Sequence, residues 1–161
     1  MANDSVAATI GKLVQYIAGK FLRGEVQLGD LIGLSDKEID AIFLTGHFLY
    51  SYGRYKDSLS IFSVLTLYKP FTSRYWRAAG AANQALKQYP EAILAFDMAI
   101  GTNISDVVSY TYRGESKLYA GDQHGGVEDL KQAVILGGAN QEYRQWTKRA
   151  DALLKVRQMN T

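Results

Sequence analysis

The chain of 161 residues has no cysteine, only two prolines and only two histidines. The lack of cysteine excludes disulfides, thiol nucleophiles, cysteine-ligated zinc and iron–sulfur clusters, and it suits a reducing compartment. Few prolines and an apolar content of 47% argue against disorder, because such a chain can bury a packed core. We therefore expect a single folded domain over residues 1–161.

An excess of charge of one sign is also missing. The 18 basic and 16 acidic residues leave a net charge of +2, which is far from the basic surface typical of nucleic-acid binders. No long hydrophobic run is present near the start, where Gly11, Lys12 and Gln15 interrupt the apolar residues and no basic segment precedes them. We expect no nucleic-acid partner, no signal peptide and no membrane insertion, and hence a cytoplasmic protein.

The residues that usually carry catalysis are sparse. His47 and His124 lie far apart, and neither has a second histidine nearby to complete a metal or catalytic cluster. Gly11-Lys12 lacks the preceding glycine spacing and the following hydroxyl residue of a phosphate-binding loop. The sequence therefore predicts no catalytic residue, no cofactor site and no metal site, and we do not expect an enzyme.

What the chain does contain is a repeat. Gly46, Gly80 and Gly114 recur every 34 residues. A small residue on each of two paired helices lets their backbones approach closely while larger side chains fill the space beside them. The pattern predicts three helix hairpins over residues 39–72, 73–106 and 107–140. The matching columns are the small residues Ser58, Ala92 and Gly126 and the large residues Phe62, Phe96 and Leu130.

Both ends of the repeat array also have helical patterns. Residues 1–35 contain an amphipathic helix followed by glycines that interrupt it. Asn140 can cap a final helix within residues 141–158, which would cover the open end of the stack. The apolar face of the first helix is formed by Val6, Ile10, Leu13, Val14, Ile17 and Phe21.

A 34-residue helical hairpin with small residues at its eighth and twentieth positions resembles the tetratricopeptide repeat. Tyr55 and Tyr89 stand at the seventeenth position, where that family favours tyrosine, and Pro70 stands at the closing position of the first repeat. The resemblance implies an all-α solenoid. In the third repeat Arg113 and Lys117 replace the usual leucine and aromatic residue, so we expect its helices to pack less firmly.

Residues from about 20 to about 136 also resemble the class II chaperones for translocators of bacterial type III secretion. The likeness implies a chaperone of the bacterial cytoplasm that holds an extended segment of a hydrophobic translocator in a concave groove and keeps it soluble before secretion. It also implies a homodimer through the N-terminal helix and no nucleotide hydrolysis. The segments that carry the likeness include Phe21–Gly24, Gly33–Asp36, Gly53–Tyr55, Tyr68–Pro70, Ser73–Trp76 and Gly80–Gln84.

The first helices of successive repeats should line the concave surface, because an array of hairpins curves. The positions expected to face this surface include Thr111 and Leu118, which we do not count among the main contacts. The expected peptide-binding residues are Phe43, His47, Tyr50, Arg74, Arg77, Ala81, Gln84, Tyr112, Glu115 and Tyr119.

Other binding roles remain open. Arg74 and Arg77 could clamp the C-terminal carboxylate of a partner, as in general tetratricopeptide-repeat adaptors. That clamp is incomplete, since Phe43 and His47 stand where such modules place lysine and asparagine. A chaperone for another secretion component, such as a needle subunit, fits the same pattern, and the N-terminal helix could pack on its own first repeat instead of a second copy.

Overall fold

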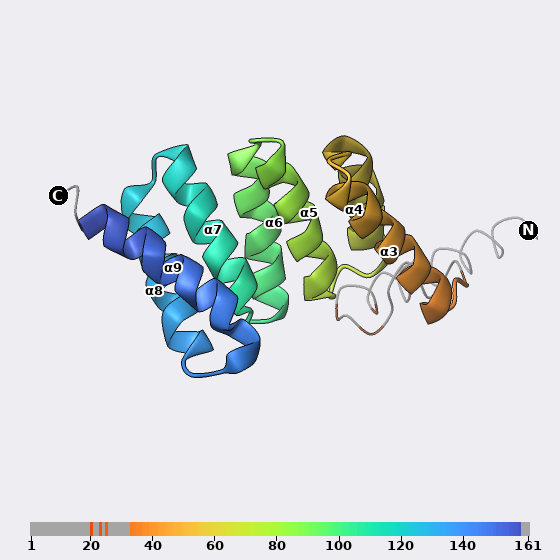
Figure 1. The fold of residues 1–161 in the computed structure, drawn as a ribbon. Coiled ribbons are helices and arrows are strands. Elements are labelled where there is room, and N and C mark those ends of the chain that lie inside the picture. Colours follow the sequence, from red (N-terminus) through yellow and green to blue (C-terminus); the bar gives the residue numbers. More distant parts are fainter. Residues whose placement is uncertain (1–19, 21–22, 24, 26–32, 159–161) are drawn as a thin grey trace, which may run out of the picture.

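The computed structural model describes residues 20, 23, 25 and 33–158. This part of the chain is all-α, as expected, with seven α-helices, one short 3-10 helix and no strand (Figure 1). The expected N-terminal amphipathic helix lies outside the described residues. The elements are α3 (Asp36–Ser51), α4 (Tyr55–Tyr68), α5 (Ser73–Ala85), α6 (Tyr89–Thr102), α7 (Val107–Ala120), α8 (Gln123–Gly137), η1 (Gln141–Tyr143) and α9 (Arg144–Gln158).

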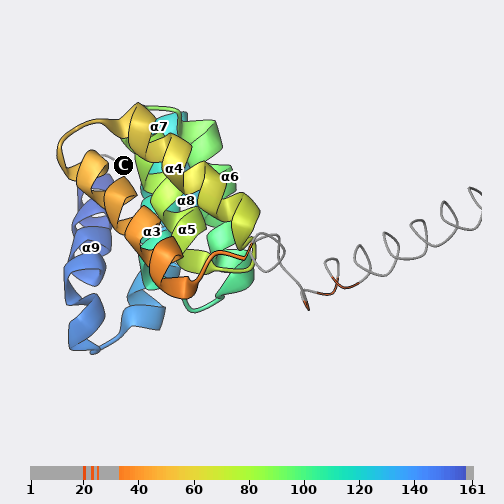
Figure 2. The same cartoon turned by 90° about the vertical axis from the view of Figure 1, so that its right-hand side faces the viewer.

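The helices form three stacked hairpins, α3–α4, α5–α6 and α7–α8, and α9 packs on the last of them. Each helix contacts the next one in the chain, and α3, α5, α7 and α9 also contact one another in that order. We call these four helices the inner row. Figure 2 looks along the stack and places α9 on the same side as α3, with α6 on the opposite side.

Close helix crossings explain the repeating glycines. A Cβ atom on Gly46 would lie 2.5 Å from the ring of Phe62, and one on Gly80 would lie 2.6 Å from the ring of Phe96. On Gly114 it would lie 2.9 Å from the backbone oxygen of Gly126. Contacts this short do not occur for real side chains, so only glycine fits at these crossings. The expected close approach within each hairpin is confirmed.

The turns of the three hairpins share one unusual backbone conformation. Gly53, Lys87 and Gly121 occupy equivalent places, 34 residues apart, and have φ angles of 76°, 61° and 95°. A residue with a Cβ atom loses about 1–2 kcal/mol in this left-handed region, whereas glycine adopts it freely. The second hairpin therefore carries a strained turn that the other two avoid.

Replacing Lys87 with glycine should remove this strain. We expect the Lys87→Gly variant to gain about 0.5–1 kcal/mol in free energy of unfolding, because the relieved strain exceeds the added entropy of the unfolded chain. Urea denaturation measures the change. Lys131→Gly is the control, since Lys131 is exposed within α8 and its replacement should cost about 1 kcal/mol. A loss of stability in both variants would contradict the account of the turn.

The third repeat is held by ion pairs where its sequence departs from the usual apolar pattern. Arg113 binds Asp129 through two contacts of 2.6 and 2.8 Å and Asp97 through a third of 2.6 Å. Lys117 lies 2.9 Å from the same Asp129. Leu130 beside them is fully buried. The expected looser packing of this repeat is wrong, because the polar side chains pair with one another across α7 and α8.

Buried side chains form two clusters along the stack. The first joins α3, α4, α5 and α6 and includes Ile39, Phe62 and Tyr75. The second joins α7 and α8 to α9, whose Ala150 is fully buried. The final helix thus covers the apolar end of the array, as a solenoid requires. None of the helices within the described ranges combines the length and hydrophobicity needed to cross a bilayer.

Candidate functional site

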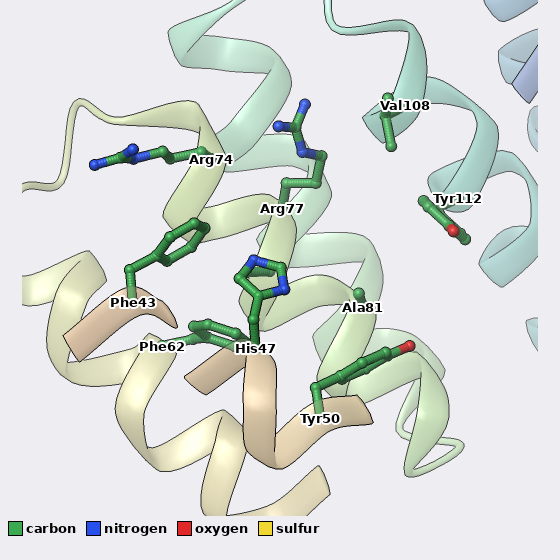
Figure 3. A pocket seen from close by; sticks show the side chains of 10 residues that line it. Phe43, His47, Tyr50, Phe62, Arg74, Arg77, Ala81, Val108 and Tyr112 are labelled. Atoms are coloured by element: carbon green, nitrogen blue, oxygen red, sulfur yellow. The ribbon is translucent and has the colours of Figure 1, made fainter. Parts of the chain in front are cut away.

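A hollow of about 330 Å³ opens on the inner row, between α3, α5 and α7. We call it the main hollow. Figure 3 shows side chains from these three helices converging on it. Because the three helices are first helices of successive repeats, the regular stacking of hairpins creates the cavity. It is lined by Phe43, His47, Tyr50, Phe62, Arg74, Arg77, Ala78, Ala81, Val108 and Tyr112.

The aromatic wall of the main hollow comes from α3. Phe43, His47 and Tyr50 are spaced so that they share one face of this helix. The ring of Phe43 lies 4.5 Å from His47, 5.7 Å from Phe62 and 5.3 Å from Tyr75, measured between centroids. Phe43 therefore belongs partly to the core, while Phe62 is almost fully buried and forms the floor of the cavity.

The aromatic wall on α3 carries no charge near neutral pH. Burial against neighbouring rings, and then the nearby charge of Arg77, lower the pKa of His47 below its usual value. Burial also raises the pKa of Tyr50, so its hydroxyl stays protonated. A cavity of this size with a neutral aromatic wall suits an apolar side chain of a bound peptide.

Arg77 is positioned by a buried carboxylate. Its guanidinium lies 3.0 and 3.1 Å from the two oxygens of Asp106, whose side chain is only 1% exposed. Asp106 also caps α7 by accepting from the backbone of Ser109, and it accepts a hydrogen bond from the hydroxyl of Ser73. The network ties the start of α5 to the start of α7 and directs Arg77 across the edge of the main hollow.

Arg74 is held in a similar way at the opposite edge. It binds Asp40 and donates to the hydroxyl of Tyr75, and its guanidinium lies 5.0 Å from the centre of the Phe43 ring. Arg74 and Arg77 thus each already have a carboxylate partner within the chain. This arrangement disfavours a clamp for the C-terminal carboxylate of another protein.

Two further hollows continue along the inner row. The middle hollow, about 240 Å³, lies between α5, α7 and α9, and the far hollow, about 330 Å³, lies between α7 and α9. Tyr50 lines both the main and the middle hollow, whereas Glu115 and Tyr119 line both the middle and the far one. The three cavities therefore form one track.

All ten residues expected to bind a peptide lie along this track, and their role in binding stays a prediction. Gln84, Glu115 and Tyr119 line the middle hollow, and the other seven line the main one. Glu115 is not a free surface carboxylate, because Arg149 binds both of its oxygens at 2.7 Å and Gln84 donates to it. Of the two further positions, Thr111 is fully buried and does not face the track, whereas Leu118 packs in the core and also lines the far hollow.

Several residues that line the hollows are not among those expected from the sequence. Val108 stands one helical turn before Tyr112, so the spacing on α7 could have indicated it. Phe62 is one of the large residues expected to fill the space between paired helices, and its ring also forms the cavity floor. Arg149 comes from the capping helix, and nothing in the repeat pattern places it against Glu115 and the ring of Tyr112.

The described residues contain no cluster of side chains suited to catalysis or metal binding. His124 is exposed at the start of α8, where it lies 3.7 Å from Glu128. Among the described residues no group of three or more histidines and carboxylates could hold a metal ion. The arrangement along the track can bind a chain segment, and we find no constellation on it for bond-making chemistry.

Several known proteins are similar to this chain. No protein-family model matches the chain. Low calcium response locus protein H of Yersinia pestis is 23% identical over 142 residues, which cover 88% of this chain and 84% of that protein. The translocator chaperone SycD of Yersinia enterocolitica superposes with a TM-score of 0.77 at 21% identity, over 81% of this chain and 98% of SycD.

A third relative has been solved with a bound partner. PcrH of Pseudomonas aeruginosa, in complex with the chaperone binding region of PopD, superposes with a TM-score of 0.74 at 25% identity, over 77% of this chain and 93% of PcrH. The chain has the fold of a type III secretion translocator chaperone. The expected tetratricopeptide-repeat solenoid and the resemblance to these chaperones are confirmed. SycD is also known with a peptide of the translocator YopD and as an alternative dimer.

Proposed function

We propose that this chain is a type III secretion chaperone that binds an extended segment of a hydrophobic translocator protein and keeps it soluble before secretion. The main hollow carries the proposal, because it is an open cavity with a neutral aromatic wall on the inner row of a chaperone fold. The bound translocator peptides of SycD and PcrH support a client of the same class. The protein acts in the bacterial cytoplasm, and its function needs no catalytic step.

The chemistry of the groove suits an extended peptide. An apolar side chain of the client enters the main hollow between Phe43, Tyr50 and Tyr112, where burial of aromatic surface supplies most of the binding energy. Arg74 and Arg77 lie at the edges of the cavity, each oriented by its own carboxylate. Remaining donor positions of these guanidiniums can meet carbonyl groups of the client backbone.

We also propose a homodimer, which the alternative dimer of SycD supports. The N-terminal residues expected to pair lie outside the described part of the chain. A monomer mass measured by light scattering for the full-length protein would contradict this proposal.

Co-expression tests the function directly. Each hydrophobic protein encoded beside the gene of this chain is expressed twice, once together with the chain and once without it. We expect one of these proteins to be soluble only with the chaperone and to co-purify with it in a defined ratio. Limited proteolysis of the complex then defines the protected client segment. If every candidate partitions identically with and without the chaperone, the proposed function is wrong.

A further inference from the structure

The wall of the main hollow contains a histidine, the side chain type whose charge changes in mildly acidic solution. His47 lies on α3 beside the rings of Phe43 and Phe62, whose centroids are 4.5 and 5.3 Å from its own. These rings cover part of the imidazole, and the rest stays exposed to solvent. Figure 3 shows it pointing into the cavity between Phe43 and Tyr50. An apolar side chain that enters the main hollow therefore lies against the imidazole of His47.

The main hollow offers no acidic partner to a positively charged His47. Its lining residues, all within the described part of the chain, include two arginines and no carboxylate. The arginines are paired with Asp40 and Asp106, which do not line the cavity. A charge on His47 would therefore stand beside the cations Arg74 and Arg77 of α5 without compensation. Such a charge is costly once a bound peptide closes the cavity to water.

The other helices around His47 add no charge in acidic solution. Helix α4 contributes the ring of Phe62, while α3 and α7 contribute the phenols of Tyr50 and Tyr112. A phenol is neutral at acidic pH. Burial, and then the charge of Arg77, lower the pKa of His47, so the imidazole of the free chain is neutral near pH 7. Its protonation is the change of charge that mild acidification brings to this cavity.

Binding of an apolar side chain should oppose this protonation further. The occupant removes water from the exposed part of the imidazole, and burial disfavours the charged form of a histidine. The pKa of His47 is then lower in the complex than in the free chain. By linkage, the affinity is complete above the pKa of the free chain and falls as the pH drops below it. The loss is at most about tenfold for each pH unit, until the pKa of the complex is reached.

We propose that His47 makes the grip of the main hollow on its client dependent on pH, so that acidification releases the bound segment. The neutral imidazole is part of the aromatic wall, whereas the imidazolium has no acidic partner in the cavity and disfavours an apolar occupant. This inference rests on the proposed function and adds a means of regulation to the same site.

Calorimetry with a peptide of the protected client segment tests the inference between about pH 8 and pH 5. We expect the affinity of the full chain to be constant above about pH 7 and to fall about tenfold by pH 5. Titrations at about pH 5.5 in buffers of different ionisation enthalpy should show protons released on binding, up to one for each complex. Circular dichroism at each pH checks that the helices are retained.

Three variants assign the effect to one side chain. His47→Phe keeps a ring in the wall and His47→Gln keeps a polar group, and neither titrates in this range. In both, the affinity should be independent of pH and binding should release no proton, whatever its value near neutral pH. His124→Gln is the matched control, because the side chain of His124 is 87% exposed on α8 and lines none of the three hollows. It should retain the pH dependence of the unmodified chain.

Carboxylates of the peptide are the same in every titration, so a difference between variants belongs to the chaperone. A pH dependence that persists in both His47 variants overturns the inference. An affinity of the unmodified chain that stays constant or rises toward pH 5 also overturns it, and the proposed function then still stands. If the peptide does not bind the unmodified chain even near neutral pH, the proposed function itself fails, and the inference fails with it.

Discussion

Replacing Asp129 with alanine is expected to lower the free energy of unfolding by about 3 kcal/mol. The side chain of Asp129 is 7% exposed and accepts contacts from both Arg113 and Lys117, which are themselves 15% and 21% exposed. Removing the carboxylate leaves two largely buried cations with one outer partner, Asp97. The desolvation of these cations is then no longer compensated, so the native state loses stability. Denaturation with urea, followed by circular dichroism, gives the value.

The control uses the other carboxylate of the same network. Asp97 is 44% exposed, and its pairing with Arg113 is screened by water, so Asp97→Ala should cost less than about 1 kcal/mol. Equal losses in the two variants would show that burial of Asp129 does not decide the effect. The comparison also tests why the third repeat tolerates charge at positions that are usually apolar.

Replacing Tyr50 with alanine should weaken binding of the translocator segment by about 2 kcal/mol or more, which corresponds to roughly thirtyfold. Tyr50 is half-buried, and its ring stands where the main and middle hollows meet. A client passing from one hollow to the next must cover this ring. Calorimetry with a peptide of the protected client segment measures the loss, and the melting curve of the variant shows whether the fold is retained.

Tyr52→Ala is the matched control for this measurement. It removes the same side chain at the end of the same helix, but Tyr52 is 70% exposed and lines none of the three hollows. Unchanged affinity in Tyr50→Ala, with helicity intact, would reject the groove as the binding site. Phe43→Ala should also weaken binding, but its ring packs on Phe62 and Tyr75, so the same variant should lose stability as well. Tyr50 therefore separates binding from folding more cleanly.

Local patterns in the sequence were enough to predict the helices and how they pair into hairpins. The recurrence of Gly46, Gly80 and Gly114 at a constant interval indicates a close helix crossing in each repeat. Each crossing depends on contacts within a single hairpin. The face of α3 that carries Phe43 and Tyr50 also follows from helical spacing alone. These features are predictable because each depends on contacts between neighbours in the chain.

The polar contacts were not predictable in this way. Arg77 of α5 meets Asp106, the residue that caps α7, and Arg149 of α9 meets Glu115 of α7. The sequence pattern does not identify the partner of a charged side chain, because a long side chain can reach several oppositely charged residues. The assignment of Arg113 to a loosely packed repeat failed for this reason.

The amino-acid sequence by itself determined that this protein is an all-α array of three hairpins with its first helices turned toward one surface, because small and large residues alternate with the period of the repeat. Only the tertiary structure decided that this surface is hollowed at three connected places and that α9 forms one of its walls. Cavities arise where side chains from separate repeats fail to fill the space between them, and that depends on how the hairpins are stacked.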